Sequence, residues 1–196
     1  MKRPGLTPAR LVAAAADLAD DAGLAAVTVS ALARHFAVQP ASVYSHVNGL
    51  DHLLDETTAL ALTELADQLA DSLPGKSGRA ALVAFANTHR DYARAHPGRW
   101  QATHRRISAD APGVTPATRI SRAARAIVQG YGLSATDEVH AVRLLGSAVD
   151  GFLALESGGG FDHSFPPASD SFARIIDAVD SSLRHWPAAA STPPTD

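Results

Sequence analysis

The sequence predicts an all-α protein of about nine helices, because apolar residues recur at helical spacing along most of the chain. No segment shows the strict alternation of apolar and polar residues that a half-buried strand would need. Proline and glycine residues separate the helical segments from one another. We expect an N-terminal three-helix head with a helix-turn-helix, followed by a C-terminal helical bundle.

The first helix begins at a well-marked N-terminus. Thr7 is a capping residue, and Pro8 occupies the first helical position, where the missing N–H costs nothing. Gly23 is expected to end the helix in the left-handed cap conformation. The predicted buried face consists of Leu11, Ala14, Ala15, Leu18 and Ala22.

Residues 28–47, TVSALARHFAVQPASVYSHV, predict two short helices joined by a tight turn. The first helix carries Leu32, Ala33 and Phe36 on one buried stripe. Ala37 and Val38 form the turn, and Val38 is the apolar contact between the two helices.

The second of these helices is expected to expose most of its side chains. Gln39 is the expected N-cap, Pro40 takes the first helical position, and only Val43 and Val47 point inward. Small and hydrogen-bonding residues on a short helix suit close approach to base edges and phosphates in a major groove. The residues expected to face solvent are Gln39, Ala41, Ser42, Tyr44, Ser45 and His46.

The remaining elements follow from breaks in the chain. A long helix runs from near Leu50 to Pro74, and Ser134 caps another long helix that ends near residue 157. A loop over residues 158–168 contains three glycines and two adjacent prolines. The other helices are expected at residues 79–95, 100–107, 117–131 and 169–186, with His96-Pro97-Gly98 as one of the breaks between them.

These boundaries predict two domains and a tail. Residues 7–67 are expected to form the head that contains the helix-turn-helix, and residues 76–186 are expected to form a second helical domain. Residues 187–196 are expected to be disordered on composition.

Composition places the protein in the cytoplasm and away from membranes. The chain has 196 residues, of which 46% are hydrophobic, and no apolar run is long enough to cross a bilayer. It contains no cysteine, which excludes disulfides and thiolate metal sites. The net charge of −3 argues against a general nucleic-acid binder, so a DNA-binding surface would be lightly charged.

Patterns for catalysis or cofactor binding are weak. Residues 70–77, ADSLPGKS, fit a relaxed phosphate-loop pattern, but they follow a helix where that chemistry needs a preceding strand. The chain has neither an HExxH motif nor a Gly-x-Ser-x-Gly elbow. We therefore expect no enzyme activity, no cofactor and no metal.

Several motifs between Thr7 and Leu69 resemble the DNA-binding domain of the tetracycline-repressor (TetR) family of bacterial transcription regulators. They occur in the family's order at residues 22–24 (AGL), 27–33 (VTVSALA), 42–47 (SVYSHV) and 51–54 (DHLL), with Val38 in the turn. Two positions depart from the family pattern. Ala37 replaces the usual turn glycine, which implies either a turn without positive φ or strain of roughly 1 kcal/mol. Leu50 stands near the place of a phosphate-binding lysine.

The C-terminal part resembles the WHG-type regulatory domain of one TetR subgroup. The resemblance depends on His96-Pro97-Gly98, on residues 152–159 (FLALESGG) and on residues 170–174 (DSFAR). Gly146 and Asp150 stand where that subgroup usually has tryptophan and histidine, which implies a different ligand pocket or none.

The resemblance implies that residues 7–67 bind DNA and that residues 76–186 bind a ligand and dimerise. The protein would then be a ligand-responsive regulator, most simply a homodimeric repressor that binds double-stranded operator DNA. An all-helical enzyme, or a helical interaction protein that does not bind DNA, remains the alternative. The residues expected to contact DNA are Thr28, Arg34, Gln39, Pro40, Ala41, Ser42, Tyr44, Ser45 and His46.

An unknown small molecule and a second copy of the chain are the other expected partners. The last helix carries a regular apolar stripe, predicted to form the dimer interface with the long helix before it: Phe172, Ile175, Ile176, Val179 and Leu183. Aromatic, imidazole and acidic residues are expected to line a ligand site: Phe85, His89, Tyr92, Trp100, His104, Asp150 and Phe152. Ordinary core packing with satisfied hydrogen bonds is the simpler explanation of His89 and His104.

Overall fold

The computed structural model describes residues 6–106 and 113–187. These residues form nine α-helices and one short 3-10 helix, with none in a strand, so the predicted all-α class is confirmed. Residues 188–196 of the expected tail lie outside the described residues. In chain order the elements are α1 (Pro8–Ala22), η1 (Leu24–Ala26), α2 (Val29–Phe36), α3 (Pro40–Tyr44), α4 (Leu50–Ser72), α5 (Gly78–Ala95), α6 (Pro97–Thr103), α7 (Val114–Gln129), α8 (Ala135–Ser157) and α9 (Ala168–Arg184).

The described residues group into two compact units. The first consists of Met1–Gly75 and Ala84–Ala123, and the second of Lys76–Val83 and Ala124–Asp196. The first unit is larger than the proposed head of residues 7–67, because α6 packs against both α1 and α4. We keep residues 7–67 as the proposed DNA-binding domain within that unit.

Caps explain where α1 begins and ends. The Thr7 hydroxyl accepts from the Arg10 N–H at 3.3 Å, and Pro8 is the first helical residue, as expected. Gly23 ends the helix at φ 83°, ψ 155°, so the expected left-handed cap conformation is wrong. This extended conformation with positive φ is essentially restricted to glycine. On the buried face Ala16 and Ala19 are covered, whereas the expected Ala22 is exposed.

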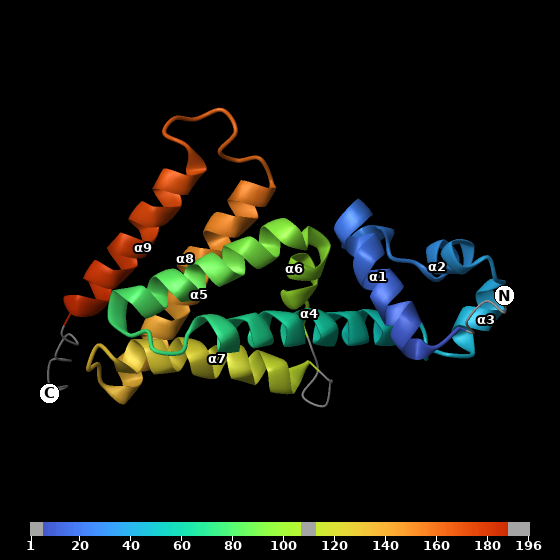
Figure 1. The fold of residues 1–196 in the computed structure, drawn as a ribbon, viewed down its shortest axis with the longest axis horizontal. Helices are drawn as coiled ribbons and strands as arrows, with labels where there is room; N and C mark the ends of the chain where they lie inside the picture. The colour runs from blue at the N-terminus through green and yellow to red at the C-terminus, as the bar shows by residue number, and fades with distance from the viewer. Residues whose placement is uncertain (1–5, 107–112, 188–196) are drawn as a thin grey trace, which may run out of the picture. The chain divides into compact units, whose positions relative to one another are not determined.

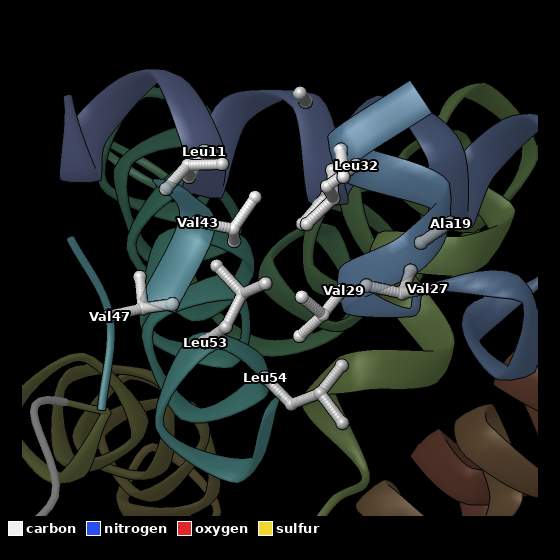
Figure 2. Close-up of a cluster of buried hydrophobic side chains, with 12 residues drawn as sticks. Leu11, Ala19, Val27, Val29, Leu32, Val43, Val47, Leu53 and Leu54 are labelled. Carbon is white, nitrogen blue, oxygen red and sulfur yellow. The ribbon is translucent and has the colours of Figure 1, made fainter. Parts of the chain in front are cut away.

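One cluster of apolar side chains holds α1, α2, α3 and the start of α4 together (Figure 2). Leu11, Leu32, Val43 and Leu53 are each 0% exposed and converge from four different helices. Burying such a side chain contributes about 1.5–3 kcal/mol, so this cluster is the main stabilising feature of the head. The cluster holds the inner face of α3, and the outer face of this helix remains exposed.

The second unit is built on α8 and α9, which pack antiparallel (Figure 1). Ser134 caps α8 by accepting from the Asp137 N–H at 3.2 Å, as the sequence indicated. Phe152 of α8 lies 5.0 Å, ring centre to ring centre, from Phe172 of α9. Aromatic pairing therefore joins the two helices across their shared core.

Asp180 on α9 joins that helix to the end of α7. The Tyr131 hydroxyl donates to Asp180 Oδ1 at 2.6 Å, and Arg184 donates to Oδ2 at 2.9 Å. Burial raises the pKa of the Asp180 carboxyl, but these two hydrogen bonds outweigh it and leave the pKa below its ordinary value. Burial of the Tyr131 hydroxyl, together with its hydrogen bond to Asp180, raises the pKa of Tyr131. Asp180 is thus held as a carboxylate.

No helix within residues 6–106 and 113–187 combines the length and apolar character that a membrane span would need.

Candidate nucleic-acid interface

The turn between α2 and α3 is built from backbone hydrogen bonds that α2 leaves open at its C-terminus. The Val38 N–H donates to the Ala33 carbonyl at 2.9 Å, and the Ala37 N–H donates to the Arg34 carbonyl at 3.1 Å. This pair of bonds is the Schellman arrangement, which requires a left-handed residue between the helix and the turn. Ala37 occupies that position at φ 54°, ψ 47°.

Ala37 therefore adopts positive φ, the second of the two possibilities left open by the sequence. The Cβ of an L-residue makes this conformation unfavourable by roughly 1–2 kcal/mol relative to the right-handed region. The head tolerates this strain because α2 and α3 are both anchored in the same apolar cluster. The turn thus presents α3 at a fixed angle to α2.

Val43 of α3, and Val47 just beyond its end, anchor this helix to the head. Val43 is 0% exposed and Val47 is 6% exposed, and both belong to the apolar cluster of the head. Figure 2 shows Val43 pointing toward Leu53, and Val47 next to them. The apolar anchors of α3 thus lie on one side.

The opposite side of α3 carries the residues expected to contact DNA. Tyr44 is 58% exposed, and Gln39, Ala41, Ser45 and His46 are also exposed, whereas Ser42 is half-buried. Ser45 donates its hydroxyl to the Ser42 carbonyl at 2.8 Å, which closes the end of the helix. Gln39 precedes α3 without making a capping hydrogen bond, so its amide is available at the helix N-terminus.

Two further expected DNA contacts belong to α2 and its N-cap. Thr28 caps this helix by accepting from the Ala31 N–H at 3.1 Å, and Arg34 is exposed on its last turn. Arg10 of α1 lies with its guanidinium 5.3 Å from the centre of the Phe36 ring, which holds that cation beside α2. The start of α4 adds unbonded backbone N–H groups after Gly49, whose φ is 95°.

The residues expected to line a ligand site divide between the two units. Phe85, His89, Tyr92 and Trp100 are buried in the first unit, whereas His104 is exposed. Phe152 is buried and Asp150 half-buried on α8, in the second unit. That these seven side chains line one space stays a prediction.

Among the buried residues of the first unit, two pairs are well defined. His89 Nδ1 lies 2.8 Å from the Phe85 carbonyl oxygen, and the Tyr92 hydroxyl donates to Glu64 Oε2 at 2.8 Å. Burial, together with that hydrogen bond and the Glu64 charge, raises the pKa of Tyr92, so the hydroxyl keeps its proton. Trp100 differs, because its buried indole N–H has no hydrogen-bond acceptor among the described residues.

The stripe of α9 expected at a dimer interface is used within the chain. Phe172, Ile176, Val179 and Leu183 are between 1% and 6% exposed, and Ile175 is half-buried. Outside the head, the large apolar side chains of the described residues that reach the surface are Phe165 (91%), in the loop after α8, and three on α8 itself: Val139 (46%), Leu144 (37%) and Leu155 (57%). The i, i+11 spacing of Leu144 and Leu155 puts both on one face of that helix.

One set of charged residues was not foreseen from the sequence. Arg99 of α6 pairs with Asp17 and Asp20 of α1 and with Glu64 of α4. These partners are separated by 35 or more positions from Arg99, so no local pattern indicates the pairing.

Comparison with known proteins matches the C-terminal half to one family model. Residues 82–179 match the tetracyclin repressor-like C-terminal domain. Two curated proteins align with most of the chain. The chain is 31% identical to the HTH-type transcriptional regulator YobS of Bacillus subtilis over 153 residues, 78% of this chain and 80% of that protein. It is 30% identical to the HTH-type transcriptional regulator Rv0681 of Mycobacterium tuberculosis, over 78% of this chain and 71% of that one.

A solved structure shows the same fold. A TetR protein of Acinetobacter baumannii, solved in complex with minocycline, superimposes with a TM-score of 0.71 at 19% identity. The superposition covers 94% of this chain and 100% of that chain.

Proposed function

The chain belongs to the TetR family of helix-turn-helix transcriptional regulators, and we propose that it acts in the cytoplasm as a homodimeric repressor that leaves its operator when a small molecule binds. The observation that carries this proposal is the two-sided character of α3. Val43 and Val47 hold it to the head, while Gln39, Tyr44 and His46 stand free on the outer side. A short helix with one buried apolar face and one exposed polar face suits insertion into a major groove.

Direct reading of bases is assigned to Gln39. Its amide group can donate to and accept from adenine at once, which a serine or tyrosine hydroxyl cannot do with the same geometry. Tyr44, Ser45, His46 and Thr28 are suited to backbone phosphates, as is the Arg34 guanidinium. Pro40, Ala41 and Ser42 allow close approach of the first turn of α3 to the groove.

Replacing Gln39 by Ala should weaken binding to the operator by about 1–3 kcal/mol while leaving binding to scrambled DNA almost unchanged. The operator for this measurement would be recovered by selection from random duplex DNA, and affinities read by fluorescence anisotropy. Gln68→Ala is the matched control, because it removes the same side chain from an exposed position on α4. An equal loss on both DNAs would reassign Gln39 to backbone positioning.

Dimerisation is proposed through α8 and α9. Because most of the α9 stripe is buried in its own chain, we assign the contact with the partner to Leu144 and Leu155 on the exposed face of α8. Linking two lightly charged heads gains avidity that a single head lacks. The stripe predicted from the sequence then supports the interface indirectly, because it packs α9 against α8: Phe172, Ile175, Ile176, Val179 and Leu183.

A small-molecule ligand is proposed for the region around Trp100. The buried indole N–H without an acceptor is an unmet donor, and an unmet buried donor disfavours the unliganded state. We therefore propose a largely apolar ligand that offers one oxygen acceptor to this N–H. Such a ligand shifts the protein only if it binds the DNA-free arrangement more tightly.

Titration of candidate compounds should change the emission of Trp100 in a variant whose other tryptophan, Trp186, is replaced by Phe. Trp100→Phe should lower affinity for an active compound about tenfold, because one buried hydrogen bond is lost, without lowering DNA affinity. Phe85→Leu provides a control for general repacking of the apolar surroundings. A compound that releases DNA equally well from the Trp100→Phe variant would place the ligand elsewhere.

A further inference from the structure

Helix α6 lies against the head at a distance that only glycine permits. A Cβ added at Gly98 would lie 2.0 Å from both the carbonyl carbon and the carbonyl oxygen of Ala19 in α1. Those atoms belong to the backbone of a helix and cannot rotate away. The first turn of α6 is therefore in direct contact with the last turns of α1.

The N-terminus of α6 is capped by a residue of α1. The Arg99 N–H donates to Asp20 Oδ1 at 2.8 Å, while the local cap residue, His96, makes no capping bond with its side chain. His96 Nδ1 instead lies 3.1 Å from Asp20 Oδ2. The first N–H groups of a helix need such an acceptor, and a carboxylate suits the positive end of the helix. Asp20 thus supplies from α1 what a neighbouring serine or aspartate usually supplies.

The side chain of Arg99 then joins three helices. One terminal nitrogen donates to Asp17, and the other lies 3.4 Å from Glu64 Oε1. The Nε lies 3.2 Å from Asp20 Oδ2 as an ion pair, without the geometry of a hydrogen bond. Glu64 of α4 also accepts from the Tyr92 hydroxyl of α5. A planar guanidinium can serve several carboxylates at fixed angles, which a lysine ammonium cannot do. The Arg99 side chain is 14% exposed, so solvent screens these contacts only partly.

Two further hydrogen bonds tie the rest of α6 to the same elements. The Gln101 side chain accepts from the Leu24 N–H at 3.3 Å, and the Thr58 hydroxyl of α4 lies 3.3 Å from the Ala102 carbonyl oxygen. Leu24 begins η1, the segment that connects α1 to α2. Every turn of α6 is consequently bonded to an element that carries the head.

We propose that Arg99 is a positioning residue for DNA binding, which fastens α1, and with it α3, to α4 and α5 at a fixed angle. This inference depends on the proposed function, because the angle matters only when two heads must meet two half-sites. The separation of the recognition helices in a dimer must match the spacing of the half-sites. A head that can pivot loses this freedom upon binding, which weakens affinity. It can also reach half-sites at other spacings.

The test compares two DNAs with wild-type protein and Arg99→Met, which keeps an apolar stem and removes the cation. One DNA is the operator selected from random duplexes, and the other has two base pairs inserted between its half-sites. Wild-type affinity should fall about a hundredfold or more upon insertion, because simultaneous engagement is lost. Arg99→Met should bind the original operator about tenfold more weakly, since its heads must be ordered, and lose little more on insertion.

Arg119→Met is the matched control. Arg119 also pairs with an aspartate of α4, Asp67 at 2.7 Å, and both side chains are exposed. This variant should keep the wild-type penalty for the insertion. Asp20→Asn, which removes charge but little volume, should fall between wild type and Arg99→Met and serves if Arg99→Met does not fold.

Hydrogen exchange on the DNA-free protein tests whether Arg99 holds α6 to α1, separately from the proposed function. Arg99→Met should speed exchange of the amides in the last turns of α1 and in α6, while amides of α2 remain protected. Unchanged exchange there, or an insertion penalty in Arg99→Met equal to that of wild type, would overturn the inference. If exchange is faster in Arg99→Met but selection from random DNA yields no preferred duplex, the structural role of Arg99 stands and the proposed function is overturned.

Discussion

Replacing Gly98 by Ala should destabilise the first compact unit by about 3 kcal/mol, the upper part of the usual range for overpacking a tight contact. The added methyl group would lie 2.0 Å from backbone atoms of Ala19, so α6 and α1 must separate. Separation would also stretch the bond from the Arg99 N–H to Asp20. Urea unfolding followed by circular dichroism would measure the loss.

Gly146→Ala is the internal control for this substitution. Gly146 lies within α8, and a Cβ there would meet no atom within 4 Å. The same change should therefore stabilise the protein by about 1 kcal/mol, because alanine favours the helix. Equal effects at both positions would show that helix propensity, and not the close approach of α6 to α1, decides the outcome at Gly98.

Replacing Ile176 by Asp should unfold the second unit or destabilise it by about 3–5 kcal/mol, since it buries a charge without a partner. Ile176 is 6% exposed in the single chain, and Val179→Asp should act in the same way. Thermal unfolding would show an earlier transition in both variants. Ser182→Asp, an exposed position on the same helix, should leave the transition within about 0.5 kcal/mol of wild type.

The dimer is tested more cleanly at Leu155, which is 57% exposed. Leu155→Glu should leave the protomer folded and dissociate the proposed dimer, as light scattering would show. A folded, dimeric Leu155→Glu variant would place the interface elsewhere.

The helix ends show what local sequence can predict. Thr7, Pro8 and Ser134 were expected to begin helices and do so, because a cap requires only neighbouring residues. Gly23 was expected in the left-handed region and lies in the extended region with positive φ. Glycine permits both conformations, and the choice between them depends on the path that the chain takes into η1.

The partners of a buried face are harder to predict than its existence. The apolar stripe of α9 correctly indicated burial, yet spacing alone cannot say whether α8 or a second chain provides the cover. The Arg99 cluster shows the same difficulty for charge. Its residues lie at positions 17, 20, 64 and 99, and only packing of α1, α4 and α6 brings them together.

Which residues of α3 are buried and which are exposed was easier to predict. Pro40 fixed the start of the helix, and Val43 and Val47 fixed which side is buried. Six residues were thereby expected to face solvent, and five of them do, with Ser42 half-buried. That these residues contact DNA remains a proposal.

One ratio of affinities measures whether α3 binds DNA sequence-specifically. Wild-type protein would be titrated, at one salt concentration, against the duplex recovered by selection and against the same duplex scrambled. We expect the selected duplex to bind about a thousandfold or more tightly than the scrambled one, and Tyr44→Ala to lower this binding without loss of fold. Equal affinity for the two duplexes would contradict this expectation.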